Sequence, residues 1–188
     1  MMTVSKVFRS PNSDWTLGFE FIVFDENLFS PSTSCTRRFQ ICVGKNDEGM
    51  FRVYILAIKE DKILTTRDIL SFPCLDCAKA FAQCLVSGDN SAACSVHKRS
   101  GFNSNDLVDG RLVILHCLMG LDEITYDSLD DDLKHLLSQV VRLVSDGQLT
   151  WEQVIRAWEF AEQFAKQRNI SLDGVLSVFC AEAMKIGR

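Results

Sequence analysis

The chain has 188 residues, of which 47% are hydrophobic, so it is long enough to bury a core as one domain or as two small ones. No window reaches the roughly 18 uncharged apolar residues of a membrane span, and the polar, charged first residues do not match a signal peptide. We therefore expect an intracellular protein of the cytoplasm or nucleus, without a membrane span.

The charge differs between the two halves of the chain. Residues 1–101 contain 12 Lys and Arg against 11 Asp and Glu, a net charge of +1, and residues 102–188 contain 8 against 14, a net charge of −6; together these give the overall −5. A dedicated nucleic-acid binder usually carries a basic excess. Any contact with RNA is therefore expected to come from a local patch and to be weak.

Alternating apolar side chains predict strands in the first third of the chain. Apolar residues occur at every second position in three segments, 14–25, 38–43 and 50–59. This alternation places them on one face, as in a half-buried strand. The polar stretch 45–49 ends in glycine and predicts a hairpin loop, and a further short strand is expected at 62–65. The pattern predicts an antiparallel β meander.

After this meander the spacing of the apolar residues changes from that of a strand to that of a helix. Residues 77–86 carry an apolar stripe at helical spacing, with Asp76 as a candidate cap and Gly88 as a candidate end. Residues 100–106 are expected to be a loop, and the apolar run 112–119 fits either a buried helix or a buried strand.

Three further helices are predicted at 128–145, 150–168 and 171–185. The first has three aspartates, Asp130 to Asp132, where the helix dipole favours negative charge, and the second starts with a capping box of Thr150 and Gln153. The predicted fold class is therefore α+β: an N-terminal antiparallel β meander, a zinc knuckle, then a C-terminal helical bundle. We expect a β-rich zinc-binding domain at 1–100 and a helical domain at 101–188.

The zinc prediction comes from two spaced pairs of ligands. Cys74 and Cys77 form a Cys-x-x-Cys pair, and after sixteen residues Cys94 and His97 form a Cys-x-x-His pair. Four such ligands complete a tetrahedral, closed zinc site, which is structural rather than catalytic. Cys84 lies between the pairs and is a possible substitute ligand. The alternative is that these are unrelated buried cysteines in a chain that has eight.

The other cysteines, Cys35, Cys42, Cys117 and Cys180, lie on apolar stretches and are expected in the core. A thiol-dependent enzyme remains an alternative, with Cys117 or Cys84 as nucleophile and His116 or His135 as base. His116 lies inside an apolar run, which favours a core histidine over a catalytic one.

Basic side chains cluster at Arg37–Arg38 and at Lys98–Arg99, with Arg111 further on. Lys98 and Arg99 follow the predicted ligand His97 directly, so a bound zinc would hold them in place. They are the residues that we expect to contact a nucleic-acid backbone, if any contact exists.

The β-rich first half with its two ligand pairs resembles the small zinc-binding first-frame protein of plant sobemoviruses. The likeness covers residues 15–100 and rests on Cys74, Cys77, Cys94 and His97, whereas residues 105–188 have no counterpart in that family. The resemblance implies a viral accessory factor, active in the host cell, that suppresses RNA silencing and aids virus movement.

The combined prediction is a non-enzymatic zinc-binding protein that acts by binding host protein or RNA. The helical half would meet a protein partner, and the zinc knuckle would present Lys98 and Arg99. A structural zinc protein that acts only as an assembly adaptor is the remaining alternative.

Overall fold

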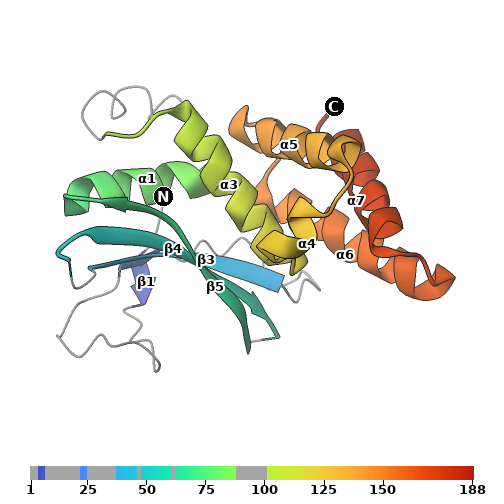
Figure 1. Ribbon diagram of the computed structural model, residues 1–188, viewed down its shortest axis with the longest axis horizontal. Helices are drawn as coiled ribbons and strands as arrows, with labels where there is room; N and C mark the ends of the chain where they lie inside the picture. The colour runs from blue at the N-terminus through green and yellow to red at the C-terminus, as the bar shows by residue number, and fades with distance from the viewer. Residues whose placement is uncertain (1–3, 7–21, 25–36, 46–47, 61, 88–100) are drawn as a thin grey trace.

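The computed structural model describes residues 4–6, 22–24, 37–45, 48–60, 62–87 and 101–188. In this part of the chain an antiparallel sheet comes first and the helices follow, which confirms the predicted α+β class. Helices α1 and α3 lie along one face of the sheet, and α5, α6 and α7 form a group beside them (Figure 1).

The sheet is the predicted meander, because each strand pairs antiparallel with the next one along the chain. Lys45 pairs with Phe51, which confirms the hairpin around residues 45–49. Most of the strand predicted at 14–25 lies outside the described residues, and its last part is β2. The strands are β1 (Val4–Lys6), β2 (Ile22–Phe24), β3 (Arg37–Lys45), β4 (Phe51–Lys59) and β5 (Lys62–Phe72).

Strand β5 is much longer than the short strand predicted at 62–65. It is the last strand in the sheet order, and its pairing with β4 is interrupted by two register shifts, between Val53 and Tyr54 and between Ala57 and Ile58. Its middle residues are Thr, Arg and Asp rather than alternating apolar side chains. An edge strand that carries charge and bulges shows a weak alternation of apolar and polar residues. This is why the sequence pattern predicted only the first part of β5.

Three predicted helices are confirmed, two of them with their predicted start signals. Thr150 and Gln153 form the predicted capping box of α6, and Ser171 caps α7. Helix α5 begins at Asp131, three residues after its predicted start, and is capped by Asp130, because Ser128 ends a short preceding helix. The helices are α1 (Leu75–Ser87), α3 (Ser104–Met119), α4 (Glu123–Asp127), α5 (Asp131–Ser145), α6 (Trp151–Arg168) and α7 (Leu172–Ile186).

Helix α3 begins inside the region 100–106, which was predicted to be a loop. It also shows that the apolar run 112–119, which fitted either a helix or a strand, is helical. It begins at Ser104, where Asn103 and Asp106 form a capping box. Its last six residues, from Ile114 to Met119, are all buried. A helix packed between a sheet and other helices is apolar on most sides, so its sequence shows no single stripe.

The core is continuous across residue 100, where the sequence suggested a domain boundary. Buried apolar residues of β3, β4, α1, α3, α5, α6 and α7 belong to one cluster. Phe39 of β3 and Trp151 of α6 stack edge to face with ring centroids 5.3 Å apart. The two predicted domains thus share one hydrophobic core in the described part of the chain.

A buried arginine, Arg111 of α3, joins this core by hydrogen bonds. Only 1% of its surface is exposed. Its Nη2 donates to the Cys84 carbonyl at 2.5 Å and its Nη1 to Ser145 Oγ at 2.8 Å. The Leu85 carbonyl, 3.5 Å from Arg111 Nε, also accepts from Trp151 Nε1 at 3.1 Å. Arg111 therefore caps the last turn of α1, where carbonyl groups lack helical partners and the helix dipole favours a cation.

Arg37 makes a second connection, from the start of β3 to the helical half. Its Nη1 donates to the Leu118 carbonyl at 2.7 Å, and its Nη2 pairs with Glu162 of α6 at 2.5 Å. The side chain is 8% exposed. Arg37 and Arg111, two of the basic residues noted in the sequence, therefore have structural partners, and neither presents a free cation to a phosphate backbone.

Helix α3 packs tightly against α1 and β5 at Gly110. A Cβ atom at this position would lie 2.7 Å from Leu85 Cδ2 and 3.0 Å from Ile69 Cγ2. Such distances are shorter than van der Waals contact, so the absence of a side chain lets α3 pack against both α1 and β5.

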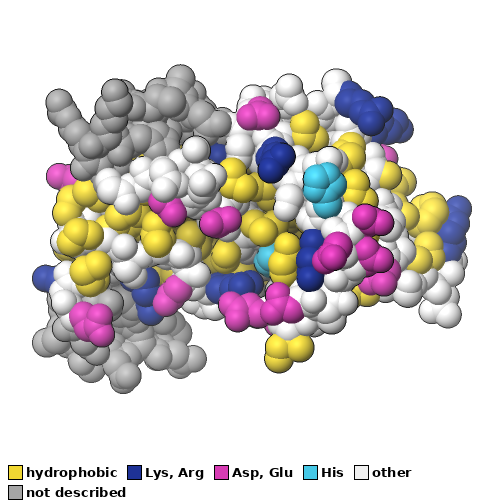
Figure 2. All heavy atoms as spheres, turned by 45° about the horizontal axis from the view of Figure 1, so that its top comes forward, with side chains coloured by type: hydrophobic (Ala, Val, Ile, Leu, Met, Phe, Trp, Pro, Cys, Tyr) yellow, Lys and Arg dark blue, Asp and Glu magenta, His cyan; other side chains and the backbone are white. Residues whose placement is uncertain are grey.

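On the face shown in Figure 2, Lys and Arg side chains lie among Asp and Glu side chains rather than in a separate basic patch. The side chain of Arg38 and all of residues 88–100, with Lys98 and Arg99, lie outside what the structure describes. The predicted nucleic-acid contact therefore stays a prediction.

Candidate functional site

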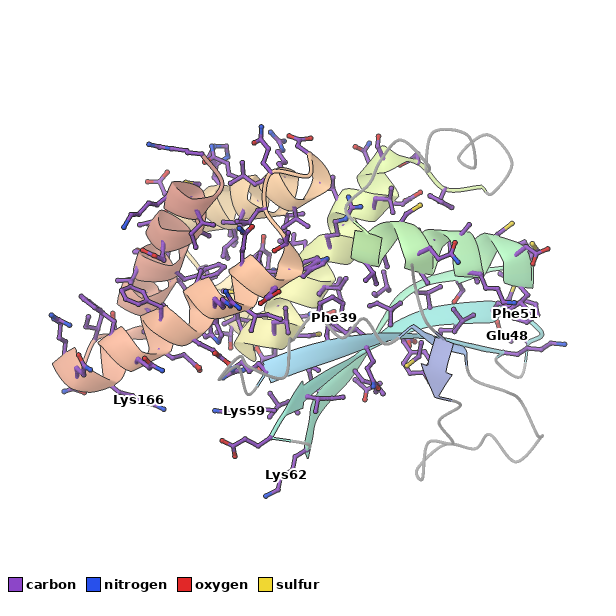
Figure 3. All side chains as sticks on the ribbon, turned by 180° about the vertical axis from the view of Figure 1, so that it is seen from behind. Phe39, Glu48, Phe51, Lys59, Lys62 and Lys166 are labelled. Carbon is purple, nitrogen blue, oxygen red and sulfur yellow. The ribbon has the colours of Figure 1, made fainter. Side chains whose placement is uncertain are left out.

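The predicted ligands Cys74 and Cys77 lie where the sheet passes into the first helix. Phe72, the last residue of β5, pairs with Phe51, the first residue of β4. Figure 3 labels Phe51 together with Glu48 at this end of the sheet. Cys74 follows Phe72 by two residues, and Cys77 lies in the first turn of α1.

Cys74 itself caps α1, in place of the predicted cap Asp76. Its carbonyl accepts a hydrogen bond from the Ala78 N–H at 3.2 Å, and its sulfur accepts one from the Cys77 N–H at 3.3 Å. A cysteine sulfur thus takes the role that Ser or Asp oxygen usually has at a helix start. The sulfurs of Cys74 and Cys77 are 3.0 Å apart, and we refer to these two side chains as the thiol pair.

The two thiols of the pair differ in acidity. The hydrogen bond between the two side chains, and then the one from the Cys77 backbone N–H, lower the pKa of Cys74. The same side-chain hydrogen bond raises the pKa of Cys77. Cys74 is exposed and Cys77 partly exposed. Cys74 is therefore the sulfur that ionises first and the one that solvent reaches best.

The thiol pair supplies two of the four predicted zinc ligands. Cys94 and His97 lie outside the described residues, and within the described part no group of three or more His, Cys, Asp or Glu could hold a metal ion. Zn–S bonds of about 2.3 Å at a tetrahedral angle place two sulfurs about 3.8 Å apart. The pair, at 3.0 Å, would need to open by somewhat less than 1 Å, which small side-chain rotations provide.

Cys84 does not share a site with Cys74. It lies ten residues further along, which is on the order of 15 Å along a helix, and it is 6% exposed. Cys42, Cys117 and Cys180 are buried, as predicted for core cysteines. Burial raises the pKa of Cys42 and Cys180 to about 12. Cys35 lies outside the described residues.

The residues of the alternative thiol enzyme are not arranged as an activated pair in the described structure. Burial raises the pKa of the Cys117 thiol, and this thiol forms a side-chain hydrogen bond with Arg67. Burial lowers the pKa of His116 to about 4, and its ring stacks on Tyr126 with centroids 4.0 Å apart. His135 is exposed and pairs with Gln139 at 2.9 Å. A nucleophile needs a base within hydrogen-bond reach, so these residues do not favour the enzyme.

Apart from the thiol pair, the structure has a hollow between the β4–β5 hairpin and the junction of α3 with α4. Its volume is about 730 Å³, and its walls mix charged and apolar side chains. Arg67 pairs there with Glu123 at 2.8 Å. Its walls contain both cations and carboxylates, so no single sign of charge indicates a ligand class. Sequence reasoning did not find this hollow, because its walls come from five separate elements, β3, β4, β5, α3 and α4.

No family model, curated protein or solved structure matches this chain. Within the described ranges, no helix has the length and apolar character needed to cross a membrane.

Proposed function

We propose that this is a non-enzymatic zinc-binding protein in which Cys74, Cys77, Cys94 and His97 hold one structural zinc ion. The observation that supports this best is the thiol pair itself: two accessible sulfurs, 3.0 Å apart, at the first turn of α1. Buried, unrelated cysteines would not be expected to lie in this way at a helix start.

The path of the chain supports the second half of the site. After the undescribed segment the chain returns with Phe102, whose ring lies 6.0 Å from Phe72 and 5.2 Å from Phe81. Phe72 precedes Cys74 by two residues, so the returning chain lies near the thiol pair. His97 is five residues from Phe102, a reach of at most about 17 Å, and this tether is compatible with His97 reaching the pair.

A site with four protein ligands leaves no open position on the metal, so it stabilises structure rather than activating water. Here it would tie the start of α1 to the segment that leads into α3. This is the reason for proposing a binding protein rather than a zinc enzyme.

Purified protein should contain about one zinc per chain, because a four-ligand structural site binds its ion tightly. Cys74→Ser and His97→Ala should each lose most of it, because each removes one of the four ligands that close the site. Elemental analysis after dialysis against a weak chelator measures this. His135→Ala is the matched control, since this exposed histidine bonds only to Gln139 among the described residues, and it should keep its zinc. Full occupancy in Cys74→Ser would contradict the assignment.

The role that we propose for the zinc protein is the one the resemblance implies, suppression of RNA silencing in a host cell. The helical half would bind the protein partner. Phe160 of α6, 48% exposed, and Leu172 at the start of α7, 40% exposed, are among its large apolar side chains in contact with solvent. An RNA contact, if present, would use Lys98 and Arg99 and would weaken steeply with salt.

A silencing-reporter assay in plant cells tests this role. The wild-type chain should restore reporter expression, and His97→Ala should restore much less at equal protein level, whereas His135→Ala should act like the wild type. If the wild type has no effect on silencing while still binding zinc, the adaptor alternative is favoured.

A further inference from the structure

The distance between the two sulfurs of the thiol pair lies between the distances expected for a zinc-bound pair and for a disulfide. A shared zinc ion would hold the sulfurs about 3.8 Å apart, and a disulfide would bring them to about 2.05 Å. The observed 3.0 Å lies between these distances. The pair can therefore close into a bond with a displacement of about the same size as the one that opens it for the metal.

The surroundings favour chemistry at this pair over the other described cysteines. Cys42, Cys84, Cys117 and Cys180 are buried, so a reagent in solution meets Cys74 and Cys77 first. Cys74 is the more exposed of the two, and the Cys77 N–H holds its sulfur at 3.3 Å beside the second thiol. An accessible thiol can attack a disulfide, and a second thiol beside it can resolve the mixed disulfide that forms.

We propose that Cys74 and Cys77 form a redox-active dithiol that exchanges with small disulfides, closing to an intramolecular disulfide and releasing zinc when zinc is bound. The exchange itself stands on the geometry of the pair, and only the release of zinc rests on the proposed function.

The reaction has two steps. The Cys74 sulfur attacks one sulfur of a small disulfide RSSR, whose S–S bond breaks, and RS⁻ leaves to take a proton. The Cys77 sulfur then attacks Cys74 Sγ in this mixed disulfide and expels the second RS⁻. Two electrons pass from the protein to RSSR, which becomes two RSH. In the metal-free pair, the two protons come from the cysteine thiols. When the thiolates were bound to zinc, Zn²⁺ is released instead of protons, and the two protons come from solvent.

The fold confines this change to the start of α1. The other end of the helix is held by Arg111, which donates to the Cys84 carbonyl at 2.5 Å. Between the two ends, Phe81 is fully buried and contacts Phe72 and Phe102 with centroids 5.2 Å away in each case. The first turn can thus rearrange while the rest of α1 stays in the core.

The test uses the full chain, as purified, with oxidised glutathione as the small disulfide. Free thiols are alkylated at intervals, and the peptide that contains residues 74–77 is identified by mass spectrometry, while a chromogenic chelator records zinc release. We expect the wild type to lose both thiols of this peptide together and to release zinc at the same rate. Cys77→Ser should stop at one glutathione on Cys74, and Cys74→Ser should react at least 10-fold more slowly. Cys180→Ser, which removes a buried thiol, should react like the wild type.

A wild type that accumulates glutathione on Cys74 without closing the disulfide would overturn the proposal, as would a pair that stays reduced in excess oxidised glutathione after the metal is chelated. The two proposals fail separately. A chain without zinc whose pair still closes supports the exchange and contradicts the zinc site, and a zinc-loaded chain whose pair never closes does the opposite.

Discussion

Replacing Arg111 by methionine should lower the free energy of unfolding by about 2–5 kcal/mol. Methionine keeps much of the side-chain volume but removes every donor. The Cys84 carbonyl and Ser145 Oγ now accept hydrogen bonds from Arg111, and a hydrogen bond to a charged group contributes about 1.5–3 kcal/mol.

Urea denaturation followed by tryptophan fluorescence measures this change. Arg142→Met on α5 is the matched control, because Arg142 is exposed, and surface substitutions usually change stability by less than about 0.5 kcal/mol. The double variant with Ser145→Ala should lose less than the sum of the two single variants, since both remove the same contact. A loss below about 1 kcal/mol for Arg111→Met would show that the buried hydrogen bonds are not a main support of the core.

Replacing Phe81 by alanine should cost about 3–5 kcal/mol, the usual range for a large aromatic side chain lost from a core. Phe81 is 0% exposed and touches Phe72 of β5 and Phe102 before α3, so its ring joins the sheet, α1 and the returning chain. It also lies against Gly110, where an added Cβ would come within 3.3 Å of its Cζ. Removing the ring leaves a cavity between elements that are far apart in the sequence.

The same unfolding experiment checks this result with two comparisons. Phe81→Leu should cost clearly less, because it keeps most of the volume. Phe160→Ala, at a position that is 48% exposed, should stay within about 0.5 kcal/mol of the wild type. Equal losses for Phe81→Ala and Phe160→Ala would contradict the central place of the Phe72, Phe81 and Phe102 contacts.

Both substitutions also bear on how the halves of the chain unfold. Arg111 and Phe81 join α1 and the sheet to the helical half, and the apolar core is continuous between them. We therefore expect each variant to unfold in one transition rather than to release the sheet while the helices remain folded.

Local signals in the sequence determined much of the secondary structure. The period of two in residues 38–43 and 50–59 predicted β3 and β4, and the capping box of Thr150 and Gln153 predicted the start of α6. These features depend on neighbouring residues and on which side chains prefer water, and both are written in a short window. The Cys-x-x-Cys spacing likewise indicated that two sulfurs would lie together, as they do at 3.0 Å.

Only the tertiary structure decided how these elements combine. Arg37 and Arg111 read as surface cations in the sequence, yet they are buried because partners 125 and 34 residues away accept their hydrogen bonds. The full length of strand β5 depends on its pairing with β4 rather than on its own sequence pattern. The sulfur of Cys74 and the guanidinium of Arg111 cap the two ends of α1. Such contacts join residues far apart in the chain, so their energy depends on the packed fold and no local pattern records it.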